Sequence, residues 1–310
     1  METKFLGYKL KSPVIVASSP ATENVQNLMK CYNNGVGAVI LKTAAEYQGG
    51  EISQKRKWYW GENGIWAQSS FEREVSRLTD CCQMIQEVKN KIDIPIIASV
   101  TSNSWNIEGW LEGIERLVAS GADMVQLDLF YLSQEVDGDK MEDNLKSLLK
   151  SVCGQNKCMI IPKLNINMPL VKVNKVLKEA GIKGVSILDS VRVPPPVEID
   201  EYNKLKYPKG IGSVGTSCFG NWQLPLTEAY LYEAVKEGLE VCAGGGICSP
   251  TDGIQLLMRG AKTIQVATGI LRNGFSWLMD LNNEIDCFLG KYELTLEELW
   301  VKGVELVKCE

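Results

Sequence analysis

The chain has 310 residues, of which 45% are hydrophobic, and its formal net charge is −5. That length accommodates a large core, and because no stretch is strongly basic we expect no nucleic-acid partner. The sequence contains no histidine, which excludes Ser-His-Asp triads, Cys-His dyads and histidine-ligated metal sites, and we expect no metal. The N-terminus lacks the apolar region of a signal peptide and no apolar run is long enough to span a membrane, so no membrane association is expected.

The ten cysteines are scattered along the chain, and most lie in apolar or helical contexts. Without a C-x-x-C motif or a secretion signal, they are predicted to be the reduced thiols of a cytoplasmic protein. A disulfide between Cys153 and Cys158 is the alternative that the spacing leaves open. The spacing also matches no iron–sulfur cluster, so any such cluster would belong to a partner protein.

One local pattern occurs four times: an amphipathic segment, a glycine, an apolar run and a polar residue. The glycines are Gly35, Gly121, Gly181 and Gly260. Glycine is suited to the left-handed residue that ends a helix. The apolar runs are typical of parallel strands that are buried on both faces. The repetition predicts a barrel of alternating strands and helices, in which polar strand ends form the active site.

Eight apolar runs have the composition of such strands. In chain order they are residues 13–18, 38–42, 95–100, 124–128, 159–163, 185–188, 239–243 and 263–267. We therefore predict an α/β fold, a TIM (β/α)8 barrel, as a single domain over residues 1–310. The long connections 43–70 and 191–225, after the second and sixth strands, are predicted to be active-site insertions, with decorative loops as the alternative. Residues 294–310 are predicted to form a C-terminal helix.

Glycine-rich or small residues follow the last two predicted strands. Gly244-Gly245-Gly246 follows the seventh strand and precedes Ser249-Pro250, a favoured helix start. Ala267-Thr268 follows the eighth. Backbone amides and a helix N-terminus at these two positions are typical of a barrel phosphate site. A tight turn is the alternative for the glycine run taken alone.

These motifs, in this order, resemble the dihydroorotate dehydrogenase family of FMN-binding barrels over about residues 4–292. The motifs that carry the resemblance are Ser12-Pro-Val-Ile-Val-Ala-Ser18, Leu41-Lys42-Thr43, residues 95–100, Pro162-Lys163-Leu164, Gly244-Gly-Gly-Ile247 and Gln265-Val-Ala-Thr268. The resemblance implies FMN as cofactor. The cofactor-binding residues that it implies are Ala17, Ser18, Lys42, Thr43, Ser99, Asp128, Lys163, Asp189, Ser190, Gly220, Gly245, Gly246, Ala267 and Thr268.

Lys163 is the residue that the resemblance places against the flavin. A lysine there would stabilise the negative charge that develops on the reduced ring. It lies in an apolar strand, where an ammonium group is costly unless it meets an anion. For Lys163 and Lys42 alike, a side chain that reaches solvent at the strand tip is the alternative.

The substrate motifs depart from the family pattern. The family's fourth strand ends in Asn-x-Ser-Cys-Pro-Asn, whereas this chain has Asp128-Leu-Phe-Tyr131-Leu-Ser133, with Tyr131 at the position of the catalytic base. Asp189-Ser190 stands where the family has an asparagine. Because those asparagines clamp the pyrimidine acid in the family, their replacement by carboxylates predicts that dihydroorotate is not the substrate. Asp128 and Asp189 instead favour a neutral or cationic one.

We therefore expect an FMN-dependent oxidoreductase that transfers a hydride between the flavin and a C–C or C–N bond of a small molecule. Tyr131 is the expected acid or base, with Lys42 and Lys163 as further catalytic residues. Other roles stay open: packing for Tyr131, a flavin hydrogen bond for Asp128, and a pair with Arg192 for Asp189.

Other functions also stay open for the whole chain. They are a non-catalytic or repurposed barrel that binds FMN or phosphate, an FMN-free lyase or isomerase of phosphosugars, and a true dihydroorotate dehydrogenase with an altered site. The resemblance also implies a homodimer, a separate electron-transfer protein and a role in pyrimidine metabolism. Trp58-Tyr59-Trp60 in the first insertion is interpreted as a pocket wall or part of a dimer interface.

Overall fold

The structure, a computed structural model, describes residues 1–46, 57–62, 64–68, 75–102, 104–130, 132, 140–155, 158–193, 198–199, 205–206 and 216–309. Its barrel strands are β3 (Val14–Val16), β4 (Ala38–Ile40), β9 (Ile96–Val100), β10 (Met124–Asp128), β11 (Met159–Lys163), β12 (Gly184–Ile187), β17 (Glu240–Gly244) and β18 (Thr263–Val266). They pair in the order β10-β11-β12-β17-β18-β3-β4-β9, and β9 pairs back to β10, which closes the barrel. The predicted TIM barrel and its eight strands are confirmed.

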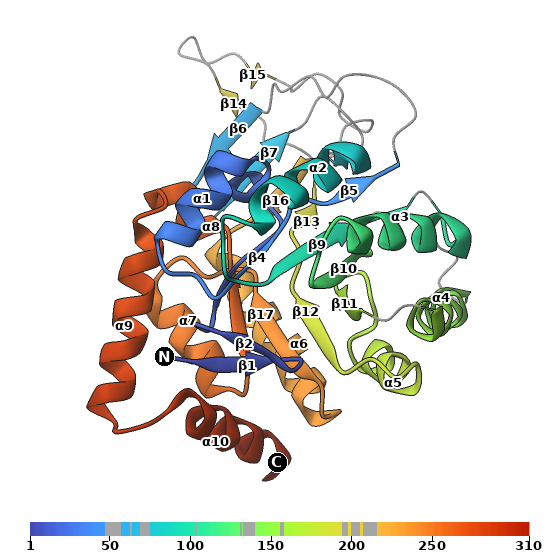
Figure 1. Cartoon of the computed structure of the whole chain (residues 1–310). Coiled ribbons are helices and arrows are strands. Elements are labelled where there is room, and N and C mark those ends of the chain that lie inside the picture. Colours follow the sequence, from blue (N-terminus) through green and yellow to red (C-terminus); the bar gives the residue numbers. More distant parts are fainter. Residues whose placement is uncertain are drawn as a thin grey trace.

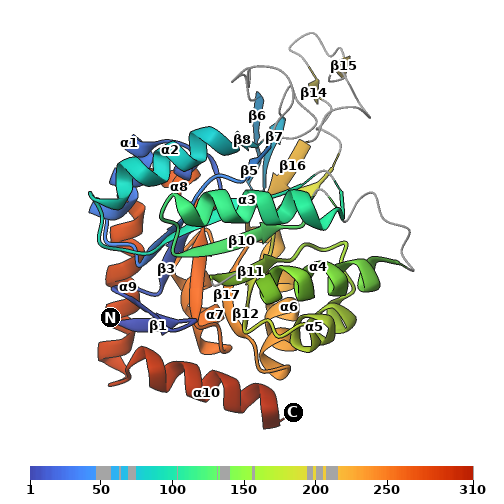
Figure 2. The same ribbon diagram turned by 45° about the vertical axis from the view of Figure 1, so that its right-hand side comes forward.

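Helices surround the barrel in both views (Figure 1, Figure 2). They are α1 (Val25–Asn33), α2 (Leu78–Lys89), α3 (Ile107–Ala119), α4 (Met141–Gln155), α5 (Leu170–Glu179), α6 (Leu224–Lys236), α7 (Pro250–Met258), α8 (Thr268–Asn273), α9 (Trp277–Lys291) and α10 (Leu296–Cys309). The glycines of the repeated pattern all adopt the left-handed conformation expected at helix ends, with φ of +77° at Gly35, +107° at Gly121, +81° at Gly181 and +95° at Gly260. None of the helices described is long and apolar enough to cross a membrane.

The alternation of side chains along the strands divides the core in two. Inward residues, with the hairpin of β1 (Thr3–Phe5) and β2 (Tyr8–Leu10), fill the barrel at the N-terminal ends of its strands. This inner cluster contains Phe5, Leu6, Leu10, Ile15, Ala38, Ile40, Ile97, Met124, Ile161 and Cys242. The hairpin is held there by Leu6, whose N–H donates to the Glu240 side chain at 2.7 Å.

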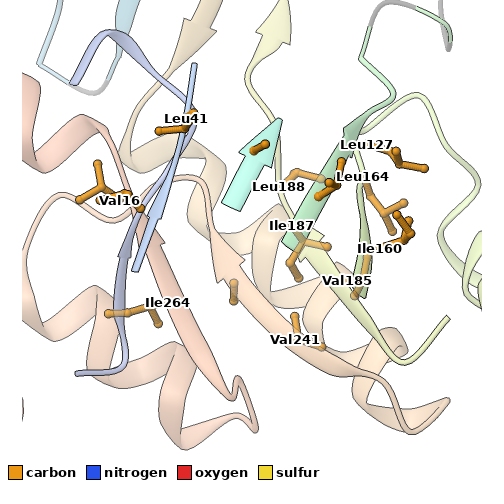
Figure 3. Close-up of a cluster of buried hydrophobic side chains, with 14 of the residues drawn as sticks. Val16, Leu41, Leu127, Ile160, Leu164, Val185, Ile187, Leu188, Val241 and Ile264 are labelled. Atoms are coloured by element: carbon orange, nitrogen blue, oxygen red, sulfur yellow. The ribbon is translucent and has the colours of Figure 1, made fainter. Parts of the chain in front are cut away.

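Outward strand residues pack against the helices. Those labelled in Figure 3 include Val16, Leu127, Ile160, Val185, Val241 and Ile264, and all belong to one large buried cluster that also takes in helix residues. Burial of each such side chain contributes about 1.5–3 kcal/mol. Because the strands are buried on both faces, they are apolar almost throughout. A polar inward residue near the C-terminal end of a strand departs from this pattern and calls for a structural or functional explanation.

The two insertions meet in one antiparallel sheet at the C-terminal ends of the barrel strands (Figure 1). Strands β6 (Lys57–Trp60) and β7 (Ile65–Gln68) come from the first, and β13 (Val191–Arg192) and β16 (Thr216–Phe219) from the second, in the order β13-β16-β7-β6. Arg272 of α8 donates to the carbonyl oxygens of Gly61 at 2.7 Å and Glu62 at 3.1 Å, and so holds the turn of the first insertion. The second insertion ends earlier than predicted, because α6 begins at Leu224.

The predicted C-terminal helix is α10, which packs on α6 and α7. Lys262 anchors it through an ion pair with Glu297 at 2.6 Å and through its ammonium group, which lies 3.6 Å from the ring centre of Trp300. All ten cysteines are free thiols, so the alternative of a Cys153–Cys158 disulfide is wrong.

Replacing Gly303 by alanine is expected to destabilise the fold. A Cβ at this position of α10 would lie 2.7 Å from Met258 O and 2.8 Å from Gly260 Cα, backbone atoms that cannot rotate away. Overpacking of this kind costs about 1–3 kcal/mol, to be measured as the free energy of unfolding in urea.

Gly290 in α9 is the matched control, because nothing lies within 4 Å of a Cβ built there. Gly290→Ala is expected to leave stability unchanged or to raise it by up to about 1 kcal/mol. Equal unfolding free energies for the two variants would contradict the close approach of α10.

Candidate active site

A pocket lies at the C-terminal ends of the barrel strands, beneath the sheet formed by the insertions. It brings together most of the residues that the sequence predicted. Those that line it are Ala17, Ser18, Lys42, Thr43, Asp128, Lys163, Asp189, Ser190, Gly245, Gly246, Ala267 and Thr268. The predicted catalytic residue Tyr131 lies outside the described residues, so its role stays a prediction.

Asp128 and Lys163 end neighbouring strands and are register partners in the parallel pairing of β10 with β11. Both point inward, as Gln126 and Ile161 do two residues earlier. Lys163 is only 5% exposed, and its Nζ lies 3.4 Å from Asp189 Oδ2. Lys163 therefore meets a carboxylate inside the pocket, and the alternative of a solvent-facing Lys163 is wrong. Its contact with the flavin stays a prediction.

Asp128 is a carboxyl group of the pocket wall that is 6% exposed. It accepts hydrogen bonds from Thr43 Oγ1 at 2.7 Å and from the Phe130 N–H at 3.1 Å. Burial raises the pKa of Asp128, and the negative charge of Asp189 raises it further, while Lys163 and the two hydrogen bonds act in the opposite direction. The pocket therefore holds a carboxyl group that favours its protonated form more than an ordinary aspartate does.

Thr43 connects Asp128 to two serines. Its hydroxyl lies 2.9 Å from Ser18 Oγ and 3.0 Å from Ser99 Oγ, and Ser99 Oγ accepts from Gln126 Nε2 at 3.0 Å. Ser18 faces the pocket, but Ser99 is fully buried within the barrel and does not line it. Ser99 lies one inward position below the strand ends and bonds to Thr43, which does line the pocket. The role expected of Ser99 in cofactor binding stays a prediction.

Gly245 and Gly246 form the pocket wall after β17, with φ of +92° and +101°. A Cβ at Gly246 would lie 2.8 Å from Leu224 Cα, so glycine allows α6 to approach. Both backbone amides lie at the pocket wall, where the chain leaves β17. Such amides, beside the start of α8 at Thr268, fit the phosphate of FMN. Gly220 does not line the pocket, but it directly precedes the 3-10 helix Asn221–Gln223 at the pocket edge.

Gln265 also fits a flavin. Its Nε2 donates to Ser186 Oγ at 2.8 Å and to Ile187 O at 2.7 Å. Its Oε1 is buried and has no hydrogen-bond partner among the described residues, although Gln265 lines the pocket. A buried acceptor without a protein partner can accept a hydrogen bond from a ligand N–H group, and the flavin ring has such a group.

Sequence reasoning missed part of the pocket wall. The further lining residues are Ser19, Pro20, Phe130, Leu188, Ser217, Phe219, Gln223, Ile247, Gln265 and Leu271, while Trp58 confirms the interpretation of a pocket wall. Trp58 stacks on Trp60 at 5.8 Å between ring centres and meets Phe219 edge-on at 6.5 Å. Gln223 donates to the Asp189 backbone carbonyl at 2.8 Å. Gln265 was visible within its motif, but nothing local marks Phe219 or Gln223.

Comparison with known proteins agrees with this geometry. The dihydroorotate dehydrogenase family matches residues 1–289. The chain belongs to this family. It is 23% identical to the catalytic subunit of dihydroorotate dehydrogenase B (NAD(+)) of Methanocaldococcus jannaschii, over 96% of each chain. It is 21% identical to the NAD-dependent dihydropyrimidine dehydrogenase subunit PreA of Escherichia coli K12, over 92% of this chain and 72% of the relative.

Replacing Asp128 by asparagine is expected to change how stability depends on pH. Since the pKa of Asp128 is raised in the folded chain, the unfolded chain releases this proton first, near the ordinary carboxyl pKa of about 3.9. The stability that Asp128 contributes is fully present below that pH and is lost as pH rises through its folded pKa. The unfolding free energy of Asp128→Asn relative to the wild type should therefore increase with pH, in urea titrations at a series of pH values.

Asp93→Asn is the control, and it should show the opposite trend. Hydrogen bonds from Lys11 and Tyr32 lower the pKa of the exposed Asp93, so its contribution is present above the ordinary carboxyl pKa and is lost as pH falls. Parallel pH curves for Asp128→Asn and the wild type would contradict a raised pKa at Asp128.

Proposed function

We propose that the chain is an FMN-dependent oxidoreductase that transfers a hydride between the flavin and a C–C or C–N bond of a small molecule, and that dihydroorotate is not its substrate. The observation that carries this proposal is the convergence of the flavin motifs on one pocket. Ala17-Ser18 after β3, Lys163 at the end of β11, and Gly245-Gly246 after β17 all line it.

The names of the relatives support the reaction class. One acts on dihydroorotate and another on dihydropyrimidines, and both are named as dehydrogenases. They are also named as subunits, which supports a separate electron-transfer partner for this chain. We propose that such a partner holds any iron–sulfur cluster, because the cysteine spacing here fits none.

Bound FMN would supply the hydride acceptor or donor. The chain's own residues would do the rest. The amides of Gly245 and Gly246 and the start of α8 would hold the phosphate, and Lys163 would balance negative charge on the ring. Trp58 and Phe219 would close the open side of the pocket to water. Lys42, which also lines the pocket, would add a second positive charge.

The charge of the pocket supports a substrate other than dihydroorotate. Asp128 and Asp189 are both wall residues, at positions where the resemblance predicts asparagines that bind the pyrimidine acid. Lys163 is already paired with Asp189, so an anionic substrate would meet a lysine whose charge is partly balanced. A neutral substrate incurs no such repulsion.

The first test is the visible spectrum of the purified protein and the chromophore that it releases on denaturation. A flavin spectrum and released FMN are expected. The reduced protein is then mixed without oxygen with orotate, uracil, thymine and cyclic enones, and reoxidation of the flavin is followed. Orotate is expected to be among the poor oxidants. A colourless protein that cannot be reconstituted with FMN would end the proposal, and rapid formation of orotate from dihydroorotate would end its substrate clause.

Lys163→Ala is expected to bind FMN and to lose about 10²–10³-fold in the rate of hydride transfer, because a charge aimed at the reacting ring is removed. Stopped-flow reoxidation of the flavin measures this rate. The control is Lys172→Ala on α5, an exposed lysine paired with Glu142 far from the pocket lining. Equal rates for the two variants would show that Lys163 has no role at the ring.

A further inference from the structure

Asp128 has the features of a group that handles protons. It ends β10, it lines the pocket, and its two oxygens each have a fixed donor, Thr43 Oγ1 and the Phe130 N–H. Fixed donors hold the carboxyl plane in one orientation. The cysteine or serine that the resemblance implies as base is replaced by Tyr131 in this chain, and Asp128 lies three residues before that position.

The hydrogens around Thr43 can be assigned by elimination. Ser18 Oγ accepts from the Thr43 N–H at 2.9 Å, and Ser99 Oγ accepts from Gln126 Nε2 at 3.0 Å. When Asp128 is ionised it can only accept, so Thr43 must donate its single hydroxyl hydrogen to Asp128. Ser18 and Ser99 then both donate to Thr43 Oγ1. Every hydroxyl in this arrangement is satisfied.

A proton on Asp128 reverses part of this arrangement. The carboxyl O–H then donates to Thr43 Oγ1, and Thr43 turns its own hydrogen toward Ser18 or Ser99. If it turns toward Ser18, the Ser18 hydroxyl hydrogen is released from Thr43 and can point into the pocket. The protonation state of a buried carboxyl is thereby linked to a hydroxyl at the pocket surface by two short hydrogen bonds, 2.7 and 2.9 Å long.

We propose that Asp128 is the catalytic acid and base of this pocket, and that Thr43 and Ser18 carry its proton to and from the pocket surface. This inference rests on the proposed flavin-dependent function and names the proton donor of the same site.

The step balances in the direction of substrate reduction. A hydride from the reduced flavin would add to one atom of a C=C or C=N bond, and the other atom would take the proton of the Ser18 hydroxyl. Ser18 takes the Thr43 hydroxyl proton and Thr43 takes the carboxyl proton of Asp128, so that Asp128 becomes a carboxylate held by Thr43 and Phe130. The substrate gains the two electrons of the hydride and two hydrogens. A proton from water then returns to Asp128 through Ser18 and Thr43.

The charges around Asp128 set the direction of its pH dependence. Among the described residues, those that share the pocket are Lys42 after β4, Lys163 at the end of β11, and Asp189 after β12. Burial and Asp189 raise the pKa of Asp128 and together outweigh Lys163 and the hydrogen bonds. The acid form therefore persists above the ordinary carboxyl range, where a proton donor is useful.

The first experiment needs no substrate. Infrared difference spectra of the FMN-loaded protein are recorded through a pH titration, and the carbonyl stretch of protonated carboxyl groups is followed. We expect a band that disappears above the ordinary carboxyl pKa, that is absent in Asp128→Asn, and that shifts in Thr43→Val because its hydrogen-bond partner is lost. If the spectrum of Asp128→Asn equals that of the wild type at every pH, Asp128 holds no such proton and the proposal is wrong.

The second experiment measures transfer, with the compound that reoxidises the reduced flavin fastest in the panel above. The wild-type rate should fall as pH rises through the pKa of Asp128. Asp128→Asn, which keeps the shape and hydrogen bonds of the protonated carboxyl, should lose about 10²–10⁴-fold and this pH dependence. Thr43→Val should be slowed in the same direction but by less.

Thr101→Val is the matched control for Thr43→Val. Its hydroxyl donates to the Asp128 backbone carbonyl at 2.9 Å and does not touch the carboxyl group, so its pH profile should follow the wild type. If FMN binds and the flavin is reoxidised, but Asp128→Asn keeps the wild-type rate and pH profile, this inference is wrong and the proposed function stands. If no FMN binds, the proposed function itself is wrong, and the infrared titration of the FMN-free protein then decides whether Asp128 holds its proton.

Discussion

The closure of the barrel by the pairing of β9 with β10 is the constraint on which the rest of the structure depends. Because all eight strands are parallel and the circle is closed, their C-terminal ends lie on one rim. Side chains that are distant in the sequence therefore lie close together at this rim. Asp128 and Lys163 meet because they are register partners, and Asp189 joins them from the next strand end.

Closure also fixes what can be buried inside. The lower part of the barrel is apolar and is filled by the N-terminal hairpin, whereas polar side chains appear among the inward positions nearer the rim. Ser99, Gln126, Ser186 and Gln265 are buried there and bond mostly to one another or to the backbone. They form a floor that holds the pocket residues in place, as Ser99 holds Thr43 and Ser186 holds Gln265. A rigid floor of this kind is what a site that orients a flat cofactor requires.

Much of the fold and of the candidate site could be predicted from the sequence, because the signals are local. A glycine such as Gly35 ends a helix through its own backbone conformation, and a buried strand such as β10 is marked by its apolar run. The rest depends on distant pairings. Strands β7 and β16 pair residues about 150 positions apart. Neither segment has a local sequence pattern that predicts its pairing with the other. Phe219 and Gln223 were missed for that reason, and the burial of Ser99 below the pocket was not predicted because spacing along a strand does not show depth in a barrel.

The central claim is that one pocket, built from strand ends and from both insertions, holds FMN beside Lys163 and Asp128. A crystal structure of the protein purified with its own chromophore tests this most directly. The account predicts FMN in the pocket, with its phosphate at Gly245, Gly246 and Thr268 and its ring between Ala17-Ser18 and Lys163. A phosphate ligand without a flavin at this position, or a flavin bound elsewhere on the chain, would contradict it.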